Sequence, residues 1–318
     1  MTMKMRGLGK TGLTIAPLVL GGNVFGWTVD EKTAFSLLDA FVEAGLNAID
    51  TADVYSAWAP GNHGGESETI IGKWLQKRPG LRDRIVLITK VGWTLGPQQG
   101  GLSERWIMEA VEGSLRRLQT DHIDLYFAHR PDPETPCEET LGAFARLRDA
   151  GKIRALGASN FNAGQLGDAL AVASAFGLPR YEVLQPEYNL YDRAGFDGAL
   201  SEMVQQEDIG VITYYSLASG FLTGKYRSAD DLDLSPRGRG VARYLDQRGL
   251  CILEALDTVA DGLEAKPAEV ALAWTMARAG VTAPIASATS LAQLESLVRA
   301  TQLELSTEQI ALLDRVSG

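Results

Sequence analysis

The sequence has few cysteines, fewer positive than negative side chains and no long apolar run. Its two cysteines, Cys137 and Cys251, are far apart and lack CxxC spacing, which excludes a disulfide framework and a thiolate metal site. The formal net charge of −10 argues against binding to nucleic acid or an anionic membrane, because a negative surface repels phosphates. The start lacks the apolar core of a signal peptide, and no stretch could span a bilayer. We therefore expect a soluble, cytoplasmic protein.

What the sequence does contain is the balance of a globular protein. Of its 318 residues, 45% are hydrophobic and 22% are charged, which allows a large core in two ordinary domains or in one barrel. No linker, charge block, repeat or low-complexity segment divides the chain. We therefore treat residues 1–318 as a single domain.

Short apolar runs alternate with longer segments of helical periodicity, which is typical of parallel strands joined by crossover helices. The expected strands span residues 18–21, 46–50, 84–90, 122–128, 153–158, 181–184, 210–213 and 281–287. Eight such units favour a closed (β/α)8 TIM barrel. A doubly wound open sheet usually has fewer strands and a GxGxxG turn, which residues 21–26 lack.

Several expected helices have recognisable ends. Residues 30–44 are followed by Gly45, and Ser103 can cap the helix that reaches residue 118. Residues 291–299 and 306–316 are expected to be helices after the eighth strand, the second being an extra carboxyl-terminal helix. Residues 5–15 are expected to form a β-hairpin that plugs the bottom of the barrel.

Four titratable side chains follow or end three neighbouring strands: Asp50, Tyr55, Lys90 and His129. Each alone has an ordinary explanation, as a loop cap, a packing residue, a rim charge or a core histidine. Active sites of such barrels lie at the carboxyl ends of the strands, where all four would meet. Gathering them without a role would be costly, because unpaired charges are expensive to desolvate. We therefore expect a catalytic site.

The chemistry of these groups suggests a proton transfer. A phenol with a pKa near 10 is a poor proton shuttle at neutral pH, and a nearby ammonium is expected to bring that pKa down. Lys90 can supply the ammonium, Asp50 can hold it in place, and His129 can orient a substrate oxygen or assist the transfer. Because no side chain delivers hydride, such a site also implies a nicotinamide cofactor.

Five segments together resemble the aldo-keto reductase signature in order and spacing, over essentially the whole chain. They are residues 45–55, 65–68, 88–90, 124–129 and 157–161. The resemblance is to the branch that includes channel β-subunit-like and general stress oxidoreductases. It implies that Asp50, Tyr55, Lys90 and His129 form a catalytic tetrad. Tyr55 would be the general acid in reduction and the base in oxidation of a small aldehyde, ketone, sugar or alcohol.

The resemblance also implies a cofactor cleft after the later strands. Ser159, Asn160 and Gln185 would bind the nicotinamide amide, and Tyr214 would stack on its ring. The loop 213–226 would approach the pyrophosphate, with Lys225 near phosphate; otherwise it is a mobile surface loop. A P-loop over residues 220–225 is rejected because its spacing is one residue short. The expected cofactor residues are Gly22, Asn23, Asp50, Ser159, Asn160, Gln185, Tyr214, Ser216, Leu217, Ser219, Lys225, Ser287, Thr289, Ser290 and Gln293.

The loop after the eighth strand departs from the family pattern. Many relatives place Arg or Lys at the position of Ser290 to grip the adenosine 2′-phosphate, and a hydroxyl offers less positive charge. We expect NADP(H) in preference to NAD(H), with discrimination weakened at this position. Arg237 or Arg239 either compensates or belongs to a flexible basic turn.

Three tryptophans fall in the first three loops after the strands. Trp27, Trp58 and Trp93 either pack in the core or line an apolar substrate pocket. His63 and His122 lack metal-ligand spacing, and we expect no metal. Two alternatives remain open: a cofactor-binding sensor or regulatory subunit with little turnover, and a barrel hydrolase or isomerase that uses Asp50 and His129. The sequence does not indicate the substrate, the direction of reaction or the oligomeric state.

Overall fold

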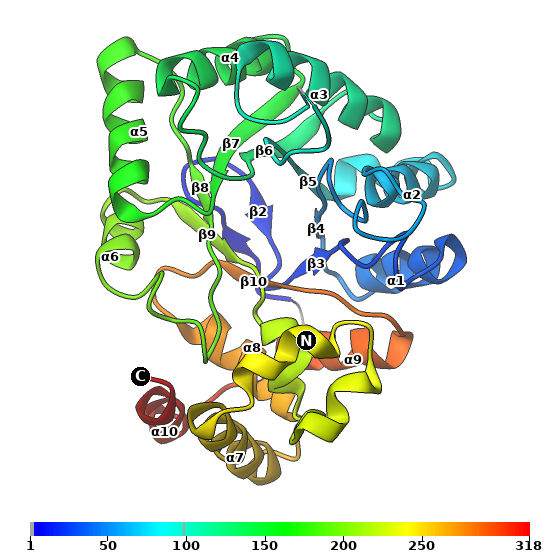
Figure 1. The fold of residues 1–318 in the computed structure, drawn as a ribbon, viewed down its shortest axis with the longest axis vertical. Coiled ribbons are helices and arrows are strands. Elements are labelled where there is room, and N and C mark those ends of the chain that lie inside the picture. Colours follow the sequence, from blue (N-terminus) through cyan, green and yellow to red (C-terminus); the bar gives the residue numbers. More distant parts are fainter. Residues whose placement is uncertain (1–2, 98) are drawn as a thin grey trace.

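A closed barrel of eight parallel strands forms the centre of the molecule (Figure 1). The computed structural model describes residues 3–97 and 99–318. Around the ring the strand order is β10-β3-β4-β5-β6-β7-β8-β9, which confirms the expected (β/α)8 barrel. The strands are β3 (Val19–Gly21), β4 (Ala48–Asp50), β5 (Val86–Val91), β6 (Ile123–Ala128), β7 (Ile153–Ser159), β8 (Val183–Gln185), β9 (Gly210–Thr213) and β10 (Ala283–Ala286).

The expected strand positions are confirmed with shifted ends. Residues Arg82–Arg84 form the short 3-10 helix η1, so β5 begins two residues later than the sequence predicted. Ser159 and Gln185 are the last residues of β7 and β8 rather than the first residues after them.

Helices cover the outside of the ring. They are α1 (Glu31–Glu43), α2 (Glu66–Gln76), α3 (Glu104–Leu118), α4 (Cys137–Asp149), α5 (Ala163–Phe176), α6 (Ala199–Gln206), α7 (Gln247–Gly262), α8 (Pro267–Ala277), α9 (Leu291–Ala300) and α10 (Thr307–Ser317), with 3-10 helices η2 (Ala218–Thr223), η3 (Ala229–Leu234) and η4 (Gly238–Tyr244) after β9. The predicted cap at Ser103 is confirmed, because its side chain accepts a hydrogen bond from the backbone amide of Trp106. Among the described residues, no helix combines the length and apolar character that crossing a membrane requires.

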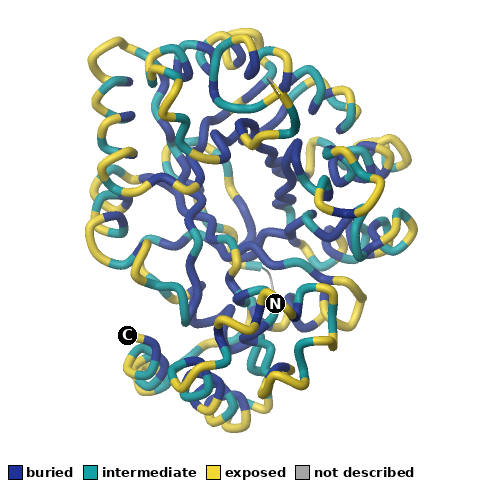
Figure 2. The backbone as a smooth tube through the Cα atoms, in the orientation of Figure 1, coloured by how far each residue is buried: buried dark blue, intermediate teal, exposed yellow. Residues whose placement is uncertain are grey.

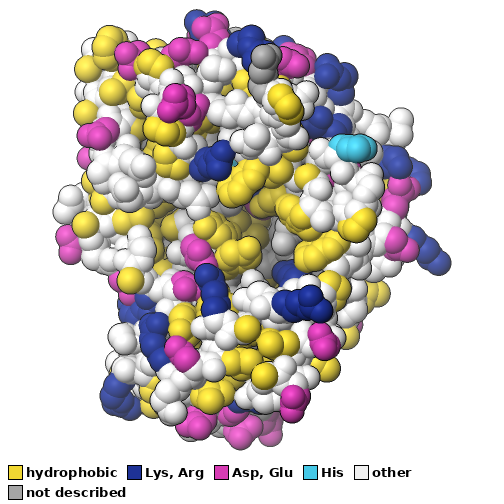
Figure 3. Space-filling model, viewed as in Figure 1, with side chains coloured by type: hydrophobic (Ala, Val, Ile, Leu, Met, Phe, Trp, Pro, Cys, Tyr) yellow, Lys and Arg dark blue, Asp and Glu magenta, His cyan; other side chains and the backbone are white. Residues whose placement is uncertain are grey.

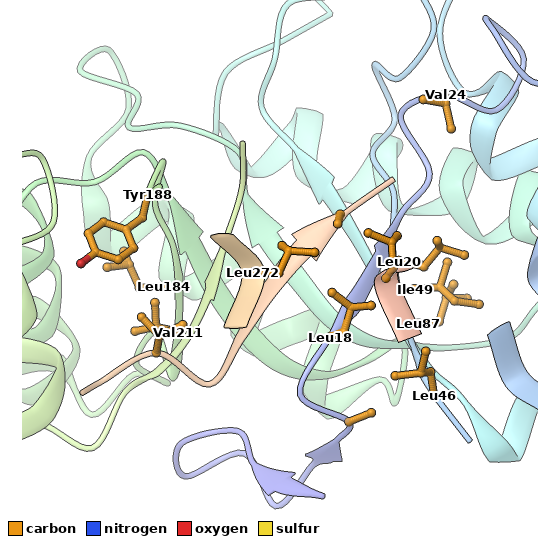
Figure 4. Close-up of a cluster of buried hydrophobic side chains, with 14 of the residues drawn as sticks. Leu18, Leu20, Val24, Leu46, Ile49, Leu87, Leu184, Tyr188, Val211 and Leu272 are labelled. Atoms are coloured by element: carbon orange, nitrogen blue, oxygen red, sulfur yellow. The ribbon is translucent and has the colours of Figure 1, made fainter. Parts of the chain in front are cut away.

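Alternation along the strands creates two layers of core. Leu20, Ile49 and Leu87 point outward on successive strands and pack beneath the helices (Figure 4). Their neighbours Ala48 and Ile88 belong to the smaller cluster inside the barrel. Figure 2 shows that burial follows this arrangement, with the strands buried and the exposed residues concentrated on the outer helices.

The amino-terminal hairpin closes the bottom of the barrel, as predicted. Strands β1 (Arg6–Gly7) and β2 (Thr14–Ile15) pair antiparallel. Leu8 and Ile15 are fully buried against the interior cluster. A Cβ at Gly9 would lie 2.5 Å from the backbone nitrogen of Gly210, so this close approach requires glycine.

Candidate active site

The four predicted catalytic residues meet at the carboxyl end of the barrel, which we call the mouth. Asp50 and Lys90 lie two residues after Ala48 and Ile88, so the same alternation that fills the barrel points them inward. His129 follows β6, and Tyr55 reaches the mouth from the loop between β4 and α2.

A hydrogen-bonded network joins three of these residues. Lys90 Nζ donates to Asp50 Oδ2 at 2.7 Å, to the Thr51 carbonyl at 2.7 Å and to the Tyr55 hydroxyl at 2.9 Å. The ammonium thereby places its three donors on three oxygens. Asp50 Oδ1 accepts from Gln185 Nε2 at 2.9 Å, and the Tyr55 hydroxyl donates to Asp50 Oδ2 at 3.3 Å. Lys90 is 0% exposed and Asp50 is 1% exposed, so the ion pair is shielded from water.

The pKa of Tyr55 differs from the sequence prediction. Desolvation of the phenol by burial, followed by the Asp50 charge, raises the pKa of Tyr55 well above its ordinary value. The prediction that Lys90 brings this pKa down is therefore wrong, because it counted the ammonium and left out the desolvation. Burial also lowers the pKa of Lys90, although the Asp50 charge opposes that shift.

His129 completes the group from the β6 side. Its ring centre lies 6.2 Å from that of Tyr55, and Asn160 Nδ2 donates to its carbonyl at 2.8 Å. Burial, then the charges of Lys90 and Arg130, lowers the pKa of His129 well below its ordinary value. The imidazole is therefore neutral at physiological pH. Its Nδ1 is buried and has no hydrogen-bond partner among the described residues.

The residues predicted to face a nicotinamide lie together beside Asp50. Ser159 Oγ donates to the Gln185 carbonyl at 2.9 Å, and Asn160 Nδ2 donates to Ser159 Oγ at 3.2 Å. The Tyr214 hydroxyl donates to Asn160 Oδ1 at 2.6 Å. These four residues and Asp50 form one connected polar band across the ends of β4, β7, β8 and β9.

The loop after β9 has unusual backbone geometry where the pyrophosphate was predicted. Ala218, Ser219 and Gly220 have φ values of 48°, 58° and 100°, a left-handed run that is costly for the two residues with side chains. The Lys225 ammonium lies 3.8 Å from where a Cβ of Gly220 would stand. The remaining predicted residues here are Ser216, whose hydroxyl bonds Thr213, and the half-buried Leu217.

The predicted residues after β3 and β10 also come together. Ser287 Oγ donates to Asn23 Oδ1 at 2.5 Å, and the Gly22 amide donates to the Asp50 carbonyl at 2.8 Å. Ser290 caps helix α9 by accepting from the amide of Gln293. The backbone amide of Thr289 donates to the Gln293 side chain, so these exposed residues form a turn at the start of the helix.

Aromatic side chains surround the mouth, and Figure 3 shows a hollow there with hydrophobic side chains inside and Lys and Arg side chains along its rim. Trp58 and Trp93 are 49% and 41% exposed, and Trp27 is half-buried, so packing in the core is the wrong interpretation for all three. The ring centre of Trp93 lies 5.2 Å from that of His129, and that of Trp58 lies 6.0 Å from that of Tyr55.

A second hollow, of about 600 Å³, lies between α5 and α6 and contains none of the predicted site residues. We place the candidate site at the mouth because the buried charges gather there. Within residues 3–97 and 99–318, no group of three or more His, Cys, Asp or Glu side chains could hold a metal ion.

Sequence reasoning missed two residues at the mouth. Arg130 stacks over the Trp93 ring, with its guanidinium carbon 4.9 Å from the ring centre. Its position directly after His129 could have indicated that Arg130 lies at the mouth. Tyr215 is 46% exposed with a φ of 53°, and only its place beside Tyr214 could have indicated it.

Comparison with known proteins agrees with this architecture. Residues 17–317 match the model of the Aldo/keto reductase family. The "Uncharacterized oxidoreductase YrpG" of Bacillus subtilis (strain 168) is 34% identical over 317 residues, covering 97% of this chain and 94% of its own. The "Probable voltage-gated potassium channel subunit beta" of Oryza sativa subsp. japonica is 34% identical over 305 residues, covering 94% of this chain and 91% of its own. With this match and the barrel that carries it, the chain belongs to the aldo/keto reductase family.

Proposed function

We propose that the protein is a nicotinamide-dependent aldo-keto reductase or alcohol dehydrogenase that interconverts a small carbonyl compound and its alcohol. Tyr55 is the proton donor in reduction and the proton acceptor in oxidation. The observation that carries the proposal is the buried ion pair of Lys90 and Asp50, with the Lys90 ammonium bonded to the Tyr55 hydroxyl at 2.9 Å. Membership of the family and the similarity to an oxidoreductase support it.

The residues present fit a nicotinamide dinucleotide. Ser159, Asn160 and Gln185 offer amide and hydroxyl groups beside Asp50, next to the half-buried ring of Tyr214. The left-handed turn with Lys225 fits a pyrophosphate. When bound, the cofactor supplies the hydride that no side chain can provide. The family favours NADP(H), which we propose over NAD(H), with discrimination limited by the uncharged Ser290.

The chain's own residues handle the proton. Because its pKa is raised, Tyr55 holds its proton at neutral pH, and the bond between that proton and the phenol oxygen breaks as the substrate oxygen takes it up. Lys90 donates to the same phenol oxygen, so its charge stabilises the phenolate left behind. Asp50 keeps Lys90 in place, and the neutral His129 orients the substrate oxygen. Water then returns a proton to Tyr55.

Substitution of Tyr55 by Phe tests the proposal. Because the change removes only the hydroxyl, we expect normal NADPH binding, measured by tryptophan fluorescence, and a loss of turnover of at least about 100-fold. Tyr126→Phe is the matched control, since Tyr126 is fully buried in the core cluster between barrel and helices and its hydroxyl has no partner among the described residues. Near-normal turnover in Tyr55→Phe would remove Tyr55 from the proton transfer.

A second candidate is a cofactor-binding sensor or regulatory subunit. It is favoured by the similarity to proteins named as probable potassium channel β subunits in Oryza sativa and Arabidopsis thaliana. The two candidates differ in turnover rather than in cofactor binding. Tight NADPH binding by the unaltered protein, with no reduction across a panel of aldehydes, ketones and sugars, would favour the sensor. Absence of cofactor binding would contradict both.

A further inference from the structure

A row of side chains leads outward from Tyr55 along one wall of the mouth. The His129 ring centre lies 6.2 Å from that of Tyr55, and the Trp93 ring centre lies 5.2 Å from that of His129. The Arg130 guanidinium carbon lies 4.9 Å from the centre of the Trp93 ring. The row thus begins at the proposed proton donor, passes two flat rings and ends in a positive charge.

The donors of Arg130 are largely uncommitted. Its Nη2 donates to Thr94 Oγ1 at 3.1 Å, and among residues 3–97 and 99–318 it has no carboxylate within 4.0 Å. Asp132 lies two residues further along, but its oxygens accept from the backbone of Leu102 and Glu134 and from the Thr135 hydroxyl. A guanidinium has five N–H donors in a planar fork, and most of them remain for a ligand.

We propose that Arg130 is a specificity-determining residue that binds the carboxylate of the substrate. The substrate class is a carboxylated aldehyde or ketone with a flat apolar body, which lies along Trp93 while its carbonyl reaches Tyr55. This inference rests on the proposed function. The fork of a guanidinium matches a carboxylate in two parallel hydrogen bonds, and the Trp93 side chain, which is 41% exposed, can contact an aromatic ring.

The net negative charge of the protein makes a local cation such as Arg130 necessary for binding an anionic substrate. With a net charge of −10, the protein repels an anionic substrate at long range, so a carboxylate must be held by a local cation. Arg237 is the other guanidinium stacked on a tryptophan at the mouth, 5.7 Å from the Trp27 ring centre. It belongs to the segment after β9 that follows the proposed pyrophosphate turn, whereas Arg130 is joined through Trp93 to His129, and we therefore assign the substrate carboxylate to Arg130.

The test compares two aldehydes that differ in charge and hardly in shape: 4-carboxybenzaldehyde and 4-carbamoylbenzaldehyde. In Arg130→Gln, we expect the KM for the carboxylate to rise about tenfold relative to that for the amide, with little change in kcat. Arg130→Lys keeps the positive charge without the planar fork, so its KM ratio should lie between those of the unaltered protein and Arg130→Gln. Arg116→Gln, an exposed arginine in the last turn of α3, changes the net charge equally and should not alter the ratio.

An unchanged ratio in Arg130→Gln would overturn the inference, as would an equal loss for both aldehydes, which indicates a structural role. Titration calorimetry of 4-carboxybenzaldehyde into the intact protein needs no turnover. Tighter binding to the unaltered protein than to Arg130→Gln supports the inference, and equal binding overturns it. Failure to reduce either aldehyde would count against the proposed function and leave this binding comparison to decide the role of Arg130.

Discussion

The two ends of the barrel are built in different ways. At the amino end, Leu8 and Ile15 fill the opening with apolar side chains, and Gly9 brings two backbones into contact. At the carboxyl end, Lys90 and Asp50 bury opposite charges beneath an open hollow. The apolar plug stabilises the fold, whereas the buried ion pair carries a desolvation cost and holds chemical groups in place.

Residues other than glycine with positive φ values are also distributed unevenly between the mouth and the rest of the molecule. Among the described residues, eight other than glycine have positive φ values. Five of them lie in loops at the mouth: Ser56, Asn160, Tyr215, Ala218 and Ser219. The other three, Gln119, Asp208 and Glu264, follow the ends of helices, where a left-handed residue commonly terminates the helix. Strained residues outside helix ends are thus concentrated where the proposed chemistry takes place.

The largest effect is expected from Lys90→Met at the carboxyl end. It leaves Asp50 charged and buried without its main partner, so we expect the free energy of unfolding to fall by about 3–5 kcal/mol, together with loss of activity. Urea unfolding measures the first effect. The double variant Asp50→Asn, Lys90→Met should recover much of the stability and none of the activity. If the double variant were no more stable than Lys90→Met, the buried charge would not be the cause.

Leu8→Ala tests the amino end. Because the side chain is fully buried against the barrel interior, we expect a loss of about 2–5 kcal/mol in the free energy of unfolding and an unchanged kcat below the melting temperature. Leu13→Ala, on the same hairpin and only partly buried, should cost less. A fall in kcat at full stability would contradict the separation between the two ends.

Ser290→Arg should change both cofactor preference and stability, because Ser290 lies in the proposed cofactor site and also caps α9. The added charge should raise the preference for NADPH over NADH about tenfold, measured as a ratio of kcat/KM values. Loss of the cap on α9 should lower the free energy of unfolding by about 1 kcal/mol. Ser290→Ala should show the loss of stability without the change in preference. An unaltered ratio in Ser290→Arg would place the 2′-phosphate elsewhere.

The smallest effect is expected from pH on the reduction reaction. Since the pKa of Tyr55 is raised, the phenol keeps its proton up to and beyond pH 10.0, and since the pKa of His129 is lowered, the imidazole is already neutral at pH 6.5. Reduction needs both the protonated phenol and the Lys90 ammonium, so its kcat/KM should stay level from pH 6.5 upward and fall only where Lys90, whose pKa burial lowers, loses its proton. Oxidation needs the phenolate, so its rate should rise with pH throughout. An inflection in the reduction profile near pH 6.5 would contradict the neutral His129.

The sequence predicted the barrel from its alternating strand and helix segments, and the meeting of the four residues from their places at or after the ends of neighbouring strands. Lys90 lies two positions after Ile88, and a residue at that spacing must point the same way. The pKa of Tyr55 could not be predicted in the same manner, since it depends on how deeply the ring is enclosed. Arg130 was missed because its stacking on Trp93 joins two loops that have no periodicity.

The side-chain amide of Gln185 ties β8 to β4 across the opening, because its donor reaches Asp50 Oδ1 over 135 positions of sequence. Gln185, which we propose contacts the nicotinamide, is therefore hydrogen-bonded directly to Asp50, the carboxylate that holds the Lys90 ammonium. A substitution at Gln185 should therefore change cofactor affinity and the position of Asp50 together, so this residue cannot alter cofactor binding without also altering proton transfer.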